Sequence, residues 1–254
     1  MKYAIISDAH ANPLALAAAL TDAHRRRCDR FVLLGDMTGY GYDVVDVVRI
    51  VRENFDVVLM GNHDSACVGL EPWMEVHTNK NYHVDVLQRG ELSSDDVEWI
   101  KALPYLHVEG NAAFVHGDFT CPEAWRYVFY PQDAIMNMME RDEQLLFCGH
   151  THHAEAWELS PDMSLSVRHS YPRPKRMERS VSKTFMVKTG CRYVINVGSV
   201  GYPRFDTCST YVIYDEGAHR ITFRHMPFDL GAYAEKLSGK GISIPFWLDD
   251  LLHL

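Results

Sequence analysis

The sequence predicts an α/β protein whose first half is built on parallel strands and whose second half adds antiparallel strands to the same core. Two observations support this prediction. Over roughly the first 150 residues, short apolar runs alternate with helical stretches, a pattern typical of βαβ units. After about residue 155, polar and apolar residues alternate with a period of two, which is typical of antiparallel strands and hairpins.

The elements of the first half follow in a regular order. A buried strand at Lys2–Ser7 precedes a helix that begins at Asn12-Pro13 and ends near Arg27, because asparagine caps helix starts and proline suits the first turn. The further expected elements are a strand at Arg30–Leu34, a helix at Asp43–Glu53, a strand at Phe55–Met60, a mostly helical stretch over 64–104, a strand at Ala112–Val115, a helix at Gln132–Arg141 and a strand at Gln144–Cys148.

The second half is expected to be rich in strands. They are placed at Ser164–His169, Thr184–Lys188, Tyr193–Val197, Thr210–Tyr214 and Arg220–His225. The proline-broken basic stretch Tyr171–Arg176 is expected to be a solvated loop, and a helix from Asp229 precedes a docked apolar segment at Ile242–Leu252. We expect a single domain over 1–254, with a division near residue 155 as the alternative.

Composition excludes several classes of protein. Of 254 residues, 47% are hydrophobic and 23% are charged, so the chain is globular and not disordered. The formal net charge of −9, from 25 basic and 34 acidic residues, argues against nucleic-acid duplex binding and against attachment to a membrane surface. The apolar runs are too short to cross a bilayer. The N-terminus meets a charged residue too early for a signal peptide.

The six cysteines show no metal-binding or redox spacing. They stand at positions 28, 67, 121, 148, 191 and 208, and no two are closer than 17 residues. We therefore expect six free thiols in a reducing cytoplasm.

Each strand of the first half is followed by a glycine or polar turn that carries possible metal ligands. Because parallel strands present their carboxyl ends at one edge of a sheet, these turns are expected to converge. One of them alone would indicate little, since Gly-Asp is usually a plain turn and a single buried histidine is usually a core residue. Together they indicate a functional site. The five turns are Asp8-Ala9-His10, Gly35-Asp36, Gly61-Asn62-His63-Asp64, His116-Gly117-Asp118 and Gly149-His150-Thr151-His152.

Taken in this order, the five motifs resemble those of the calcineurin-like metallophosphoesterases. The flanking stretches 7–12, 39–41 and 198–204 resemble the small, prokaryotic-type, phosphodiesterase-like branch of that superfamily. The resemblance runs from residue 1 to about residue 225. It implies a two-sheet β-sandwich flanked by helices, a four-layer αββα arrangement.

The resemblance also implies a site for two metal ions. His63 would be the catalytic histidine beside the metals, with Asp64 as a possible orienting partner. The ligands of one metal would be Asp8, His10, Asp36 and His152, and those of the other would be Asp36, Asn62, His116 and His150, so that Asp36 bridges.

Simple chemistry agrees with this assignment. Asp8 and Asp36 would offset two of the four positive charges of two divalent cations, and a bridging hydroxide would leave about one, which suits an anionic phosphate ester. Mixed imidazole and carboxylate ligands favour divalent transition metals, namely manganese, iron, zinc or nickel, over calcium. The pKa of an imidazole suits protonation of a leaving alkoxide by His63.

The resemblance therefore implies an enzyme that hydrolyses a small phosphate ester by attack of a metal-bridging hydroxide, with phosphodiesters of small nucleotides or similar molecules preferred. A protein serine/threonine phosphatase or a diadenosine-polyphosphate hydrolase is the alternative enzyme. A catalytically silent scaffold is the alternative from another class, but it has no need of all seven ligand side chains and His63.

Arg204 either contacts a substrate phosphate or belongs to a plain surface turn. Lid and specificity elements are expected from 66–111 and 153–192.

Overall fold

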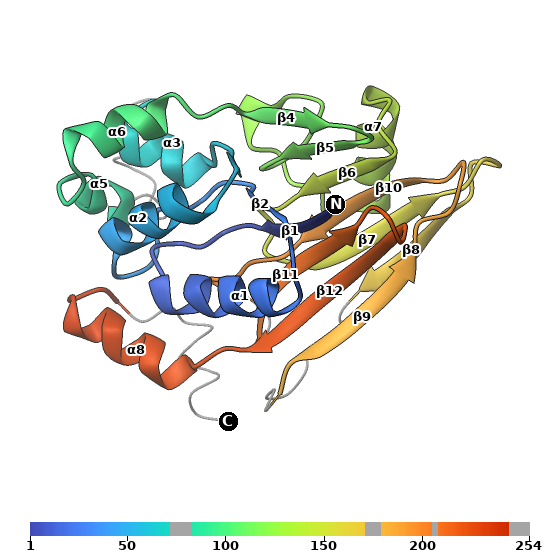
Figure 1. Ribbon diagram of the computed structural model, residues 1–254. Coiled ribbons are helices and arrows are strands. Elements are labelled where there is room, and N and C mark those ends of the chain that lie inside the picture. The colour runs from blue at the N-terminus through green and yellow to red at the C-terminus, as the bar shows by residue number, and fades with distance from the viewer. Residues whose placement is uncertain (72–82, 171–178, 205–207, 244–254) are drawn as a thin grey trace.

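The computed structural model describes residues 1–71, 83–170, 179–204 and 208–243, which form two mixed β-sheets with helices outside them (Figure 1). The first sheet has the strand order β3-β2-β1-β11-β12-β9, and the second has the order β4-β5-β6-β10-β7-β8. Strands of the first sheet are β1 (Lys2–Ile6), β2 (Arg30–Leu33), β3 (Val57–Val58), β9 (Val181–Met186), β11 (Cys208–Asp215) and β12 (Arg220–Pro227). Strands of the second are β4 (Leu106–Glu109), β5 (Ala112–Val115), β6 (Leu145–Cys148), β7 (Ala154–Leu159), β8 (Leu165–Ser170) and β10 (Arg192–Val197).

Both sheets combine strands from the two halves of the chain. In the first sheet, β1 pairs in parallel with β2 and antiparallel with β11, so that Ala4 lies opposite both Phe31 and Ile213. In the second sheet, β10 pairs in parallel with β6 and antiparallel with β7. The carboxyl ends of β1 and β2 in one sheet, and of β5 and β6 in the other, are therefore available to one shared site.

Alternation along the strands separates three apolar layers. Tyr3 and Ile5 on β1 belong to the core between the two sheets, whereas Ala4 and Ile6 face a helical layer on the outside. A third cluster packs α7 against the outer face of the second sheet. Figure 1 shows α7 apart from the other helices, so the order of layers is helix, sheet, sheet, helix, as expected. The helices are α1 (Pro13–Arg25), α2 (Val44–Asn54), α3 (Asn62–Val68), α5 (His83–Arg89), α6 (Ser94–Lys101), α7 (Pro131–Glu140) and α8 (Leu230–Gly239).

Most expected elements are present, with three differences. The strand expected at Phe55–Met60 is reduced to β3, because the Met60 N–H donates to the Pro104 carbonyl and leaves the ladder. Strands β4 and β7 were not predicted. Tyr171–Arg176 and residues 244–252 of the expected apolar segment lie outside the described residues.

The helix start at Asn12 is built as its sequence indicates. Its side-chain oxygen accepts the Ala15 N–H at 3.2 Å, and its amide nitrogen donates to the Gly201 carbonyl at 3.1 Å. The cap thus connects α1 to the turn that follows β10. Among the described residues, no helix has the length and apolar character needed to span a bilayer. All six cysteines are free thiols, as expected.

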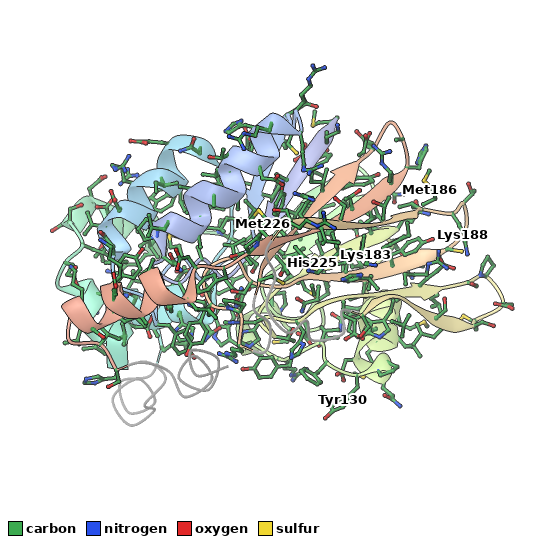
Figure 2. All side chains as sticks on the ribbon, turned by 90° about the horizontal axis from the view of Figure 1, so that it is seen from below. Tyr130, Lys183, Met186, Lys188, His225 and Met226 are labelled. Atoms are coloured by element: carbon green, nitrogen blue, oxygen red, sulfur yellow. The ribbon has the colours of Figure 1, made fainter. Side chains whose placement is uncertain are left out.

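Two buried histidines near the edges of the sheets affect stability. His169 on β8 is 7% exposed and stacks on Phe223 with ring centroids 3.9 Å apart, and His225 on β12 is fully buried (Figure 2). Burial lowers the pKa of His169 to about 4 and that of His225 to about 3. Both imidazoles are therefore neutral in the folded protein at pH values where the unfolded chain already binds protons.

We predict that the free energy of unfolding falls between pH 6.5 and about pH 4, by at most about 1.4 kcal/mol per pH unit for each histidine. The sign follows because the folded-state pKa lies below the unfolded-state value, so stability is complete above pH ~6.5 and is lost on acidification. His169→Phe preserves a ring against Phe223 and should reduce this slope, as measured by urea titrations at several pH values. Parallel curves for the wild type and the variant would contradict the prediction.

Candidate metal centre

The turns at the carboxyl ends of the strands meet between the edges of the two sheets. Their side chains are buried, and in the structure they form two neighbouring groups that a third, His10, Asp36 and His63, connects. The residues brought together are Asp8, His10, Asp36, Asn62, His63, His116, His150 and His152.

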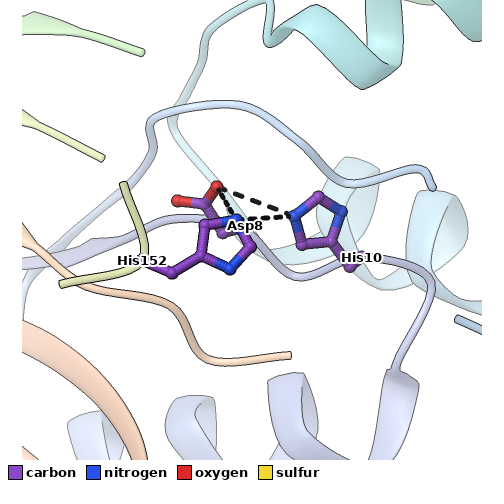
Figure 3. A group of neighbouring side chains, drawn as sticks. All are labelled: Asp8, His10 and His152. Atoms are coloured by element: carbon purple, nitrogen blue, oxygen red, sulfur yellow. Dashed lines mark hydrogen bonds and ion pairs between the residues drawn. The ribbon is translucent and has the colours of Figure 1, made fainter. Parts of the chain in front are cut away.

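The first group is Asp8, His10 and His152, whose ligand atoms all lie within 4.8 Å of one another (Figure 3). The Nε2 atoms of the two histidines are 3.2 Å apart. Asp8 Oδ1 lies 3.1 Å from His152 Nε2 and 3.7 Å from His10 Nε2. These atoms come from the turns after β1 and β6, one in each sheet.

The second group is Asp36, His116 and His150, with Asn62 beside it. His116 Nε2 lies 3.1 Å from His150 Nδ1 and 3.2 Å from Asn62 Oδ1. Asp36 Oδ2 lies 3.3 Å from His116 Nε2 and 3.7 Å from His10 Nε2, so this carboxylate stands between the two groups.

The four histidines have their tautomers set by backbone carbonyls. A carbonyl oxygen only accepts, so the ring nitrogen facing it carries the proton, and the other nitrogen of the neutral ring holds a lone pair. The donating pairs are His10 Nδ1 to Thr38 O at 2.8 Å, His116 Nδ1 to Leu34 O at 3.2 Å, His150 Nε2 to Trp125 O at 2.8 Å and His152 Nδ1 to Tyr202 O at 2.5 Å.

This arrangement fits divalent cations. In each group two imidazole nitrogens face one another at 3.1–3.2 Å, and two facing lone pairs repel unless a positive charge, either a proton or a metal ion, lies between them. A carboxylate adjoins each pair, and Asp36 is within reach of both. Neutral imidazoles with carboxylates are a ligand set that transition metals prefer.

Burial affects the ring pKa values of the centre unequally. It lowers the pKa of His150 to about 3 and that of His152 to about 4, which favours the neutral form that a metal ligand requires. For His116, burial acts in the same direction, but the Asp36 carboxylate outweighs it and raises the pKa to about 9. A metal at the second group would therefore displace a proton from His116.

The turns that carry the ligands have strained backbone. Non-glycine residues in the left-handed region cost about 1–3 kcal/mol each and occur mostly where function requires them. Five of the side chains in the two groups stand on such residues: Asp8 (φ 57°), His10 (φ 43°), Asp36 (φ 54°), His150 (φ 66°) and His152 (φ 63°). Glycine is needed beside them, since a Cβ at Gly149 would lie 2.7 Å from Asp8 Oδ2.

His63 lies next to both groups but is oriented by a residue that the sequence did not indicate. Its Nδ1 is 2.9 Å from Asp85 Oδ2, and both side chains are buried. Burial acts to lower the pKa of His63, but Asp85 and then Asp36 raise it above its ordinary value. Its ring stands perpendicular to that of His10, with centroids 5.0 Å apart.

Asp64 has a different role from the one predicted. It was predicted as a possible orienting partner of His63, but its carboxylate accepts the backbone N–H groups of Asp36, Thr38 and Gly61 at 2.7–3.1 Å. Asp64 therefore holds the turns after β2 and β3 together, and Asp85 is the carboxylate beside His63. Burial, followed by the neighbouring Asp36, raises the pKa of Asp64 to about 7.

Asp85 reaches the centre because α5 is anchored to the turn after β2. Gln88, one turn further along α5, accepts the Gly39 N–H at 2.7 Å and donates to the Gly41 carbonyl at 3.1 Å. The expected helical stretch 64–104 contained no signal for this contact, because Asp85 lies 22 residues from His63 and outside every motif.

Arg204 lies at the rim of the centre. Its Nη2 donates to the Tyr40 hydroxyl at 3.0 Å, and its Cζ lies 5.5 Å from the centroid of the Tyr40 ring. The Tyr40 ring in turn packs on His63 and His10, with centroids 4.5 and 4.8 Å away. Phenol oxygens are neutral, so these contacts orient the guanidinium group without neutralising its charge.

Two further arginines and Asp118 of the fourth motif make contacts of their own. Arg168 pairs with Glu158 at 3.4 Å, and Arg192 donates to the Glu143 carbonyl at 3.4 Å. Asp118 caps the following turn by accepting the Thr120 hydroxyl and the Cys121 N–H.

Comparison with known proteins agrees with this geometry. The chain is 27% identical over 257 residues to an uncharacterized protein of Methanocaldococcus jannaschii, with 99% of this chain and 97% of that protein covered. A shorter match, 32% over 94 residues, covers 35% of this chain and 32% of a symmetrical bis(5′-nucleosyl)-tetraphosphatase of Nitrosospira multiformis.

Among solved structures, a metallophosphoesterase from Sphaerobacter thermophilus superposes with a TM-score of 0.83 at 29% identity, over 99% of both chains. A putative diadenosine tetraphosphatase shares the fold, with a TM-score of 0.50 at 14% identity over 90% of this chain and 94% of that one. The family model for the calcineurin-like phosphoesterase superfamily domain matches residues 1–218. The chain therefore belongs to the calcineurin-like phosphoesterase superfamily.

Proposed function

We propose that this protein is a phosphoesterase with a dinuclear metal site and that it prefers phosphodiesters of small molecules. The observation that carries the proposal is the arrangement of four buried imidazole nitrogens in two pairs beside Asp36, with a separate histidine, His63, held next to them by Asp85. Superfamily membership supports hydrolysis of phosphate esters as the general reaction.

The proposed ligands divide as the two groups suggest. One ion would be held by Asp8, His10, Asp36 and His152, and the other by Asp36, Asn62, His116 and His150. When bound, such divalent ions would polarise the phosphate and lower the pKa of the attacking water.

The remaining roles belong to side chains of this chain. His63 would donate a proton from Nε2 to the leaving oxygen, since its Nδ1 is engaged by Asp85. Asp85 would act as a positioning residue that holds the tautomer and plane of that ring. Arg204 would contact the charge of the substrate phosphate from the rim.

A dinucleoside-polyphosphate hydrolase is the second candidate. The local match to the tetraphosphatase of Nitrosospira multiformis favours it, but that match covers only about a third of each chain. A screen of the metal-reconstituted protein against phosphomonoesters, phosphodiesters, dinucleoside polyphosphates and phosphopeptides separates these candidates and tests the scaffold alternative.

Metal content tests the bridging role of Asp36. Because Asp36 faces both groups whereas Asn62 adjoins only one, Asp36→Asn should lower the occupancy of both sites and Asn62→Ala that of one. Elemental analysis after dialysis measures the metals per chain. Near two metals per chain in the Asp36→Asn variant would contradict the bridging assignment.

The leaving group tests His63. His63→Gln should retain the metals but lose about 10²–10⁴-fold in kcat for an alkyl leaving group, which needs a proton. The loss should be much smaller for a nitrophenyl leaving group. Asp85→Asn should show the same dependence on the leaving group at a smaller amplitude, which a merely structural role would not produce. Equal losses for both leaving groups would assign His63 to phosphate binding instead.

Substrate charge tests the diester preference. A monoester carries close to two negative charges at neutral pH and a diester carries one, and Arg204 is the cationic side chain that the described residues bring to the rim. We predict a higher kcat/KM for bis(nitrophenyl) phosphate than for nitrophenyl phosphate. Arg204→Ala should lower kcat/KM most for the substrate that carries more charge near this rim. A clear preference of the manganese-loaded enzyme for the monoester would favour the phosphatase alternative.

A further inference from the structure

Three aromatic side chains are exposed in one short segment beside the metal centre. Tyr127, Phe129 and Tyr130 are 50%, 45% and 63% exposed, and they lie between the 3-10 turn η2 (Pro122–Ala124) and α7. Figure 2 shows Tyr130 at the outer edge of the molecule, directed away from the ribbon. Such a concentration of exposed rings is costly in water and indicates a binding surface.

This segment adjoins the second group of proposed ligands. The Tyr127 ring stacks on the His150 ring, with centroids 4.2 Å apart and an angle of 10° between the planes. The Phe129 ring is nearly perpendicular to the His153 ring, with centroids 5.5 Å apart. The exposed ring of Tyr127 therefore contacts His150, a side chain that itself faces the centre.

Hydrogen bonds hold the segment at both ends. The Trp125 carbonyl accepts from His150 Nε2 at 2.8 Å, and Trp125 Nε1 donates to Glu71 Oε1 at 2.8 Å. At the other end, the Tyr130 N–H donates to Asp133 Oδ2 at 2.8 Å. A backbone held in this way has less conformational freedom to lose when a ligand stacks on its rings, which favours binding.

A cation stands at the same rim. Arg204 Nη2 donates to the Tyr40 hydroxyl at 3.0 Å, and the guanidinium group also interacts electrostatically with Tyr127. A phosphate beside Arg204 would thus place an attached planar group within reach of the exposed rings. An anion joined to a flat, weakly polar ring system is the chemistry of a nucleotide.

We propose that Tyr127 and Phe129 form a stacking platform for the nucleobase of a nucleoside phosphodiester whose phosphate is cleaved at the metal centre. The substrate class rests on the proposed function, but the platform itself is a binding property. Every base has a π-face, so the platform selects for the presence of a base and discriminates little between different bases.

Hydrolysis tests the platform with two diesters that share a leaving group and a charge, thymidine 5′-(nitrophenyl phosphate) and methyl nitrophenyl phosphate. The wild type should have the higher kcat/KM for the thymidine ester, chiefly through KM. Phe129→Leu and Tyr127→Leu should each lower the ratio between the two substrates by about 5- to 100-fold, the range for loss of one base–aromatic stack. Tyr127→Phe retains the ring and should retain the ratio.

Met186→Leu is a matched control, because Met186 is an exposed apolar side chain on β9, at the edge of the other sheet (Figure 2). It should leave the ratio unchanged. A ratio near one in the wild type, or a ratio that Phe129→Leu and Tyr127→Leu do not change, would overturn the platform while leaving the phosphodiesterase proposal intact.

Calorimetry supplies a readout that does not depend on turnover. AMP and ribose 5-phosphate share the sugar and the phosphate and differ in the base. AMP should bind the metal-loaded wild type at least about 5-fold more tightly, and Phe129→Leu should remove the difference. This outcome would support the platform even if neither diester were hydrolysed, and equal affinities would overturn it.

Discussion

The centre depends on the commitment of four buried imidazoles to backbone carbonyls. Each ring donates one N–H to a main-chain oxygen, and its other nitrogen is thereby directed at a side chain of another ligand-bearing turn. Such contacts fix both the tautomer and the orientation of a ligand, which a side chain held only by packing would not achieve. They also require that the turns supplying the carbonyls and those supplying the rings keep one relative position.

That relative position is maintained by the layers on either side of the turns. The core between the sheets joins Ile5 on β1 to residues such as Phe147 on β6, so the two ligand-bearing edges cannot slide independently. A hydrogen bond also joins two strained residues of these edges, because the His150 N–H donates to Asp8 Oδ2 at 3.1 Å. Well-packed strands therefore compensate for backbone conformations that isolated turns would avoid.

The parts of this structure that could be predicted are those encoded locally. Alternation at Tyr3–Ile6 and the Asn12-Pro13 helix start depend on neighbouring residues, and the structure has both. Parallel pairing aligns the ligand-bearing turns within each sheet, and the packing of the two sheets brings the two sets together. In contrast, β7 was not predicted because its AEAWEL sequence includes two acidic residues whose burial, Glu158 most of all, depends on partners such as Tyr193 on another strand.

Asp85 illustrates a second limit. An aspartate in a helical stretch is an ordinary surface residue by its sequence, and only the anchoring of α5 through Gln88 turns it toward His63. The adjacent Asp64 was favoured because sequence proximity is visible, but residues next to each other at a helix start point in different directions. Its carboxylate instead accepts the N–H groups of the neighbouring turns.

The side chains around the centre therefore have two origins. The turns at strand ends supply the proposed ligands, and the segments between the strands supply the groups that would contact the rest of a substrate. Within 66–111, Asp85 contacts His63 and so contributes to the centre itself. The exposed rings of Tyr127 and Phe129 lie outside both stretches that were expected to contribute specificity, in the connection between β5 and β6. That connection begins at the turn that carries His116, and the Trp125 carbonyl within it accepts from His150 Nε2, so a short segment near its start is close to the centre.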